Sequence, residues 1–262
     1  MSYRAIAVSP LLFLLLSLAA VGLAPEAARP EVRHALVELV KAAALVGCAA
    51  GALAYAPGDY LRVGWGLTAC CYLLLLSRDA WIAFAPAAPS PAVEALHVLI
   101  ITAANACGVY GTWRLARAWH VAGFEHPGPA FARRAVVAAA VLASLVFAGP
   151  SLFVDLRAAL SGVPGSYWTV PSDLGDLLAL PLVAPVALTA LAVRGGALRW
   201  PWGLLTASLL AWLLYDAVLT IPELIAVDPT GYRPVAECFR LLAGAFACAA
   251  GFAQRRVVRE LG

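Results

Sequence analysis

Long apolar segments alternate with short polar connections along the whole chain. Eight of these segments reach about 20 residues, the length that a helix needs to cross a hydrocarbon core of about 30 Å. The pattern therefore predicts an all-α integral membrane protein, a bundle of about eight transmembrane helices. The predicted helices are residues 6–24, 31–55, 60–85, 92–119, 131–153, 173–193, 200–221 and 235–253.

The first apolar segment has two interpretations. With Arg4 as its charged start and the small residues 22–24 as its exit, it has the form of a cleavable signal peptide. Pro25 directly after that exit disfavours cleavage, and the apolar run is long for a signal sequence. We therefore expect a retained helix. Cleavage would leave a seven-helix protein.

The composition supports one membrane-embedded domain. The chain is 63% hydrophobic and 13% charged, whereas soluble domains contain about 25% charged residues. Eight helices of this kind use about 160 residues, so residues 1–262 are predicted to form a single transmembrane bundle. The net charge of +3 comes from arginines at helix ends, which favours contact with the lipid bilayer and gives no indication of nucleic-acid binding.

The arginines are distributed unevenly between the connections. They are concentrated around the connection between the fourth and fifth predicted helices, between the sixth and seventh, and after the eighth, as Arg114, Arg117, Arg133, Arg134, Arg194, Arg199, Arg255, Arg256 and Arg259. With eight helices, these regions lie on one side of the membrane, while most other connections are acidic or nearly neutral. Arg29 and Arg33 are the exception, because they would lie on the opposite side of the membrane from the other arginine-rich regions. Since short Arg-rich loops stay in the cytoplasm, we expect a multi-pass protein of the inner (plasma) membrane with both termini cytoplasmic.

Motifs for cofactor, metal or covalent chemistry are absent from the sequence. The six cysteines lie in apolar runs without a CxxC pair, and the four histidines form no HxxxH or HExxH pair. There is no phosphate-binding Walker loop and no G-x-S-x-G elbow. The only lysine, Lys41, is on the second helix, whereas rhodopsins bind retinal on the last. We expect no cofactor and no metal. An intramembrane enzyme acting on lipid is the least favoured class, because it would need an acid–base pair such as His97 with an aspartate and the sequence supplies no nucleophile.

Ionisable residues inside the predicted helices are the main functional signal, because each costs about 2.5–3.5 kcal/mol at a helix centre. They lie in the extracytoplasmic halves of six helices. Several have partners three residues away, which allows structural pairing on one helix face: Glu38 with Lys41, Glu94 with His97, and Glu237 with Arg240, besides the adjacent Arg78 and Asp79. Asp173, Asp176 and Asp216 have no basic neighbour in sequence. Asp173 has a second possible role as a helix cap.

Prolines and small residues add two weaker indications. Pro181 and Pro185 interrupt the sixth helix just after its aspartates, which is typical either of a packing bend or of a helix that borders a binding site. The spacing of Gly47 with Gly51, and of Ala247 with Gly251, permits close helix approach. We expect these residues to pack inside the chain.

Two classes of function fit these patterns. The first is a small-molecule transporter or sensor with an extracytoplasmic polar cavity that binds a cation, an amine or a proton-coupled solute. The predicted site consists of Asp216, Asp79, Asp173, Asp176, Arg78 and Arg240, with Trp81, Trp212 and Tyr215 as aromatic walls. The alternative is a non-catalytic subunit or assembly factor of a larger complex with membrane-protein partners, in which the polar residues serve only helix pairing.

Overall fold

The computed structural model describes residues 2–84, 91–124, 128–163, 166–193, 195–225 and 228–261. Every regular element in these ranges is helical. The helices are α1 (Tyr3–Leu23), α2 (Arg29–Ala52), α3 (Tyr60–Phe84), α4 (Pro91–Val121), α5 (Ala130–Phe147), α6 (Gly149–Leu160), α7 (Ser166–Ala179), α8 (Val183–Ala192), α9 (Arg199–Leu224) and α10 (Arg233–Leu261), with 3-10 turns η1 (Glu26–Ala28), η2 (Leu180–Leu182) and η3 (Pro229–Tyr232).

Eight helical segments of the described chain are long and apolar enough to cross a membrane. Seven of these segments each correspond to most or all of a single α-helix, namely α1, α2, α3, α4, α5, α9 or α10. The eighth, Thr169–Ala192, joins α7, η2 and α8. The prediction of an all-helical bundle with about eight helices of membrane-spanning length is therefore confirmed.

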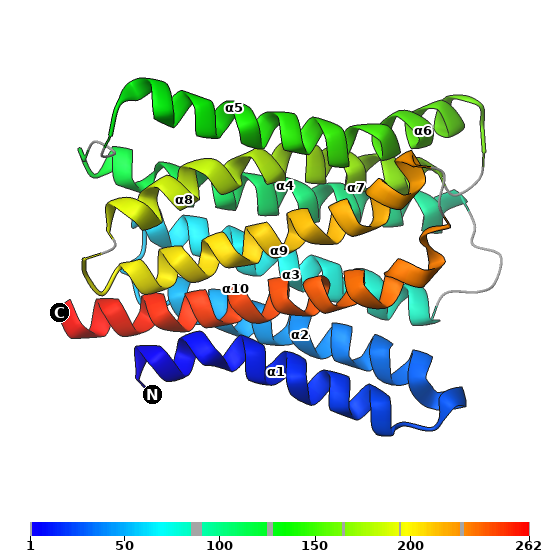
Figure 1. Cartoon of the computed structure of the whole chain (residues 1–262), viewed down its shortest axis with the longest axis horizontal. Helices are drawn as coiled ribbons and strands as arrows, with labels where there is room; N and C mark the ends of the chain where they lie inside the picture. Colours follow the sequence, from blue (N-terminus) through cyan, green and yellow to red (C-terminus); the bar gives the residue numbers. More distant parts are fainter. Residues whose placement is uncertain are drawn as a thin grey trace.

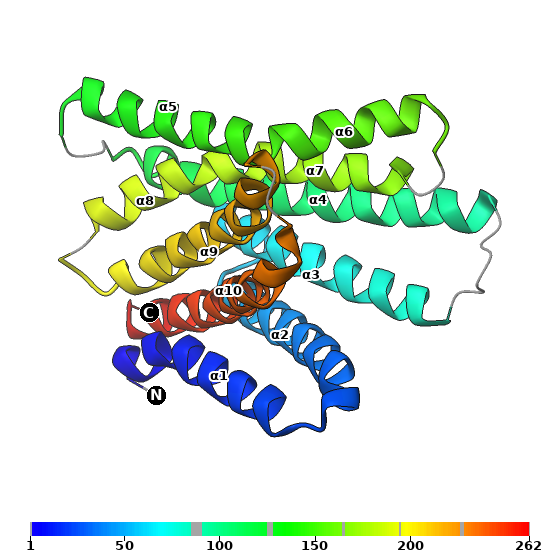
Figure 2. The same ribbon diagram turned by 45° about the vertical axis from the view of Figure 1, so that its right-hand side comes forward.

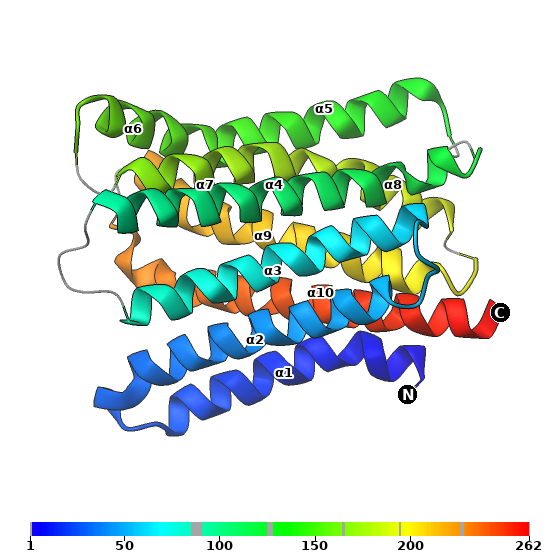
Figure 3. The ribbon, with the colours of Figure 1, turned by 180° about the vertical axis from the view of Figure 1, so that it is seen from behind.

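The helices run along one common axis, and both ends of the chain lie at the same end of the bundle (Figure 1). We call this the terminal end and the opposite one the distal end. The helices α1, α3, α6 and α9 finish at the distal end, so α2, α4, α7 and α10 start there. Two further views place α1 at one edge and α5 with α6 at the opposite edge (Figure 2, Figure 3).

Glycines allow α2 and α10 to approach closely. Gly47 of α2 and Gly251 of α10 face each other, and a Cβ atom added at Gly251 would overlap the backbone of Gly47. Gly51 also lies against Gly251, because a Cβ atom added at Gly51 would be 3.3 Å from the Gly251 Cα atom. The two small-residue motifs thus pack inside the chain, where they hold α10 against α2.

The region predicted as the longest connection, residues 155–172, is mostly helical. The helix α6 continues to Leu160, and α7 begins at Ser166. Tyr167 therefore lies in a helix, and Asp173 lies inside α7, where it cannot act as the predicted N-terminal cap. The charged end of the chain is also helical, because α10 continues to Leu261.

Hydroxyl groups satisfy the carbonyls that prolines leave without a donor. Proline has no N–H, so the carbonyl four residues before it loses its helical hydrogen bond. For Pro181 that carbonyl belongs to Leu177, and the hydroxyl of Ser144 on α5 donates to it at 2.8 Å. For Pro10 it belongs to Ile6, which accepts from Ser9 at 2.8 Å. At these two prolines the freed carbonyl thus stays paired inside the apolar layer.

Loss of the Ser144 hydroxyl should destabilise the bundle. Ser144 is fully buried, so Ser144→Ala leaves the Leu177 carbonyl without a donor and should cost about 1–3 kcal/mol. Unfolding of the purified protein in mixed micelles measures this cost. The cost should shrink in a Pro181→Ala background, where residue 181 regains an N–H. Ser77→Ala is the control, because the exposed Ser77 hydroxyl bonds a carbonyl within a regular helix. Equal costs in both backgrounds would contradict this account.

Candidate functional site

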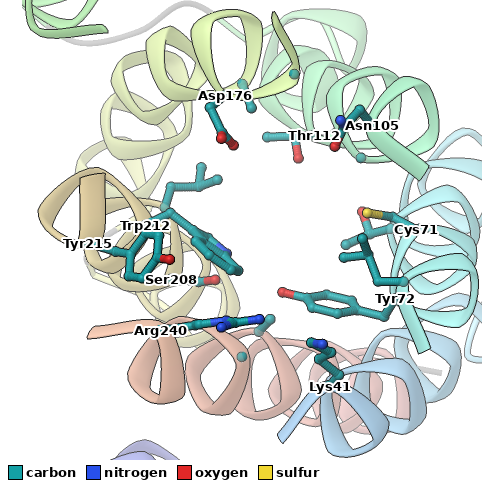
Figure 4. Close-up of a pocket in the computed structure, with 18 of the residues that line it drawn as sticks. Lys41, Cys71, Tyr72, Asn105, Thr112, Asp176, Ser208, Trp212, Tyr215 and Arg240 are labelled. Atoms are coloured by element: carbon teal, nitrogen blue, oxygen red, sulfur yellow. The ribbon is translucent and has the colours of Figure 1, made fainter. Parts of the chain in front are cut away.

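A cavity of about 340 Å³ extends from the middle of the bundle into its distal half. Its walls come from six α-helices, α2, α3, α4, α7, α9 and α10, and from the turn η2 (Figure 4). Segments far apart in sequence therefore build one site. The end of α7 that borders the cavity continues into η2, so the break at Pro181 lies at its wall.

Two carboxylates form the acidic wall. Asp176 of α7 points into the cavity (Figure 4), and Asp216 of α9 also lines it. Both border a second cavity of about 240 Å³, which is lined in addition by Asp173, Ser151 and Thr220. Among the described residues, no ion pair includes any of the three aspartates. One carboxylate oxygen of Asp173 is buried without a hydrogen-bond partner.

The contact between α4 and α7 fixes the position of Asp176. The side-chain amide of Asn105 donates to the Pro171 carbonyl at 2.7 Å. It also packs directly on Gly175, where an added Cβ atom would lie 2.5 Å from the side-chain carbonyl carbon of Asn105. Because Asp176 is the next residue, this close approach sets where its carboxylate points.

Three basic side chains border the cavity, and each has a carboxylate partner. The Lys41 ammonium contacts Glu38 at 2.7 Å and also pairs with Asp79 on α3. Arg78 donates to Asp79 at 2.7 Å. The predicted pairings of Glu38 with Lys41 and Arg78 with Asp79 are confirmed. The bridge from α2 to α3 through Lys41 and Asp79 is a tertiary contact that the sequence did not indicate.

The third basic group, Arg240 of α10, is less completely paired. Its Nη1 atom lies 3.3 Å from Glu237, as the spacing of three residues predicted. The other carboxylate oxygen of Glu237 is buried without a partner. Arg240 projects along the cavity wall opposite Asp176 (Figure 4). This arginine therefore keeps donors on the cavity side.

Aromatic and hydroxyl groups fill the wall between the acidic and basic sides. The Tyr72 hydroxyl and the Trp212 indole point into the cavity (Figure 4). The ring of Tyr215 meets Trp212 edge-on, with 5.7 Å between the ring centroids. Ser208 lines the wall and donates to the Ala243 carbonyl at 2.8 Å, which ties α9 to α10. The cavity combines charged ends with an aromatic middle.

The structure brings together most of the predicted site. The main cavity is lined by Asp176, Asp216, Arg78, Arg240, Trp212 and Tyr215, and the second cavity also by Asp173. Asp79 lies behind the wall, between Lys41 and Arg78. Trp81 lines neither cavity, and its side chain is 45% exposed. It follows Asp79 by two residues, or about 200° of helical rotation, and so occupies the opposite face of α3.

Several uncharged lining residues are absent from the site predicted by sequence. These are Cys71, Tyr72, Asn105, Thr112 and Ser208. Asn105 and Thr112 form a recognisable small polar face with Gly108, which by sequence is typical of a packing surface. The cavity opens beside that face. The others lie in apolar runs, where no pattern separates a lipid-facing position from an interior one.

Comparison of the chain with known protein families, with curated proteins and with solved structures gives no significant match. The functional conclusion therefore rests on the chemistry of the cavity: two carboxylates without a basic partner, three aromatic side chains and three basic side chains, enclosed by helical segments that are long enough to span a membrane.

Proposed function

We propose that the protein is a transporter or sensor that binds a small amine in the main cavity. The observation that carries this proposal is that Asp176 and Asp216 line a cavity without forming an ion pair with a described residue. An uncompensated carboxylate is costly within a membrane. A cationic ligand would neutralise this charge, and its ammonium group would donate hydrogen bonds to the carboxylates.

The aromatic rings support the choice of an organic cation. Trp and Tyr attract ammonium groups through their ring faces, with a contribution of about 2 kcal/mol when the site is desolvated. Trp212, Tyr72 and Tyr215 all border the cavity. Its volume, about 340 Å³, is near the lower limit of small-molecule pockets, which begin at about 300 Å³. A compact amine fits these properties best.

The distribution of charge supports an orientation with the distal end outside. Among the residues that the structure describes, 12 of the 14 acidic residues belong by position to the distal half, and 10 of the 16 arginines belong to the terminal half. The acidic exceptions are Asp59 and Glu260. Because arginine is retained in cytoplasmic loops, we place both termini in the cytoplasm and the protein in the plasma (inner) membrane. The cavity would then receive its ligand from outside.

The alternative, a non-catalytic subunit or assembly factor, is favoured by the ion pairs of Lys41 and Asp79. These pairs bridge α2 and α3 and would serve a purely structural bundle equally well. In that case Asp176 and Asp216 would bind no solute, and the protein would purify with membrane-protein partners. Measurement of amine binding by the isolated protein separates the two.

Asp216→Asn and Asp176→Asn should each fold normally and weaken amine binding by at least about tenfold. The amide keeps the shape of the side chain but removes the charge, and a hydrogen bond to a charged group contributes about 1.5–3 kcal/mol. Calorimetric titration of the purified protein with phenethylamine and ethylamine measures the effect.

Glu260→Gln, a change at the terminal end, is the control and should leave binding unchanged. Unaltered amine affinity in both aspartate variants would contradict the proposal. So would unfolding of both variants, because it would show that these carboxylates are structural.

A further inference from the structure

The Arg240 guanidinium has donors that the described residues do not use. A guanidinium carries five N–H donors, and among the described residues the hydrogen bond of Arg240 joins Nη1 to Glu237 at 3.3 Å. That bond is long for a charged pair, for which about 2.7–2.9 Å is usual. Figure 4 shows the guanidinium at the cavity wall, across from Asp176.

The two walls of the cavity therefore carry complementary hydrogen-bonding groups. Asp176 and Asp216 offer acceptors on the side of α7 and α9, and Arg240 offers donors on the side of α10. Buried polar groups are nearly always hydrogen-bonded to protein, water or ligand. A molecule with an ammonium at one end and an acid group at the other would donate to the carboxylates and accept from the guanidinium at the same time.

We infer that the ligand is a zwitterion, an amine that also carries a carboxylate, with its acid group bound by Arg240. This inference rests on the proposed function, because it assigns the ammonium end to Asp176 and Asp216. The planar guanidinium matches a carboxylate through two parallel hydrogen bonds. Lys41 and Arg78 border the same cavity and are already held by Glu38 and Asp79, which leaves Arg240 as the anion-binding group.

The body of the ligand lies between the two charged ends. Tyr72 and Trp212 project into this part of the cavity (Figure 4), and Leu75, Leu205 and Leu209 add apolar surface. These side chains favour a molecule with a short apolar or aromatic body over a fully polar one.

Two pairs of probes test the inference, because each pair differs only by the carboxylate: phenylalanine with phenethylamine, and alanine with ethylamine. Calorimetric titration of the wild-type protein should give at least about tenfold tighter binding of the acid-bearing member of at least one pair. Arg240→Gln should remove this advantage by weakening the zwitterion, while the affinity for the amine changes by no more than about twofold. Arg240→Lys should retain part of the advantage.

Arg233→Gln is the matched control, since Arg233 is exposed at the start of the same helix and lines neither cavity. If the wild-type protein binds the amine of both pairs as tightly as the acid-bearing member, or more tightly, the inference is overturned and the proposed function stays intact. This comparison requires no variant. Equal weakening of both members by Arg240→Gln would also overturn it. Failure of all four probes to bind would overturn the proposed function itself.

Discussion

Gly251→Ala should destabilise the bundle by about 3 kcal/mol, and Gly251→Leu should prevent folding. An added Cβ atom would overlap the carbonyl of Gly47, and a backbone atom within a helix cannot turn aside as a side chain could. Overpacking of this kind typically costs about 1–3 kcal/mol, and sometimes more. Separation of α2 from α10 would also move Lys41 away from Arg240 and widen the cavity. Unfolding in mixed micelles measures the stability.

Gly203→Ala is the control for this substitution. Gly203 is also helical, but nothing lies within 4 Å of the position that its Cβ atom would take. Because alanine favours the helix over glycine by about 1 kcal/mol, this change should be neutral or slightly stabilising. Equal stability of Gly251→Ala and Gly203→Ala would show that α2 and α10 do not pack through their glycines.

Lys41→Met should cost about 3 kcal/mol or more. The Lys41 side chain is buried and forms ion pairs with both Glu38 and Asp79. Removal of one member of a buried ion pair typically costs about 3–5 kcal/mol, because the remaining charge loses its compensation. Arg78 still contacts Asp79, so the unpaired charge would be mainly that of Glu38. Addition of Glu38→Gln to Lys41→Met should therefore recover part of the loss.

Arg256→Met provides the comparison for an exposed pair. Arg256 and Glu260 lie 2.6 Å apart, but their side chains are 35% and 44% exposed. Such pairs contribute at most about 1 kcal/mol, so this variant should keep nearly full stability. A similar cost for Lys41→Met and Arg256→Met would mean that water reaches the pair between α2 and α3.

The helices could be predicted because long apolar runs are required to span a membrane, but their ends could not. The segment around Asp155 and Arg157 contains charges, which predict a loop, although both residues lie in α6. Charged residues are tolerated where a helix leaves the apolar layer, since water and headgroups solvate them there. The same reason explains why α10 continues through its terminal arginines.

The charged part of the site could also be predicted, because isolated carboxylates in apolar helices are costly and therefore conspicuous. Asp216 and Trp212 are four residues apart on one face of α9, and both line the cavity. The pairing of Lys41 with Asp79 required the tertiary arrangement of α2 and α3. Tyr72 and Cys71 gave no signal, because in a membrane helix the faces toward lipid and toward the interior are both apolar.

The central claim is an amine site in a cavity that opens to the outside. Modification of Cys71 tests this claim most directly. Cys71 lines the main cavity (Figure 4), whereas Cys48 is fully buried. A membrane-impermeant cationic methanethiosulfonate, added outside intact cells, should modify Cys71 and leave Cys48 unreacted, as mapped by mass spectrometry of the peptides. Phenethylamine or phenylalanine should slow this modification. Reaction of Cys71 only from the cytoplasmic side, or at a rate that no amine changes, would contradict the account.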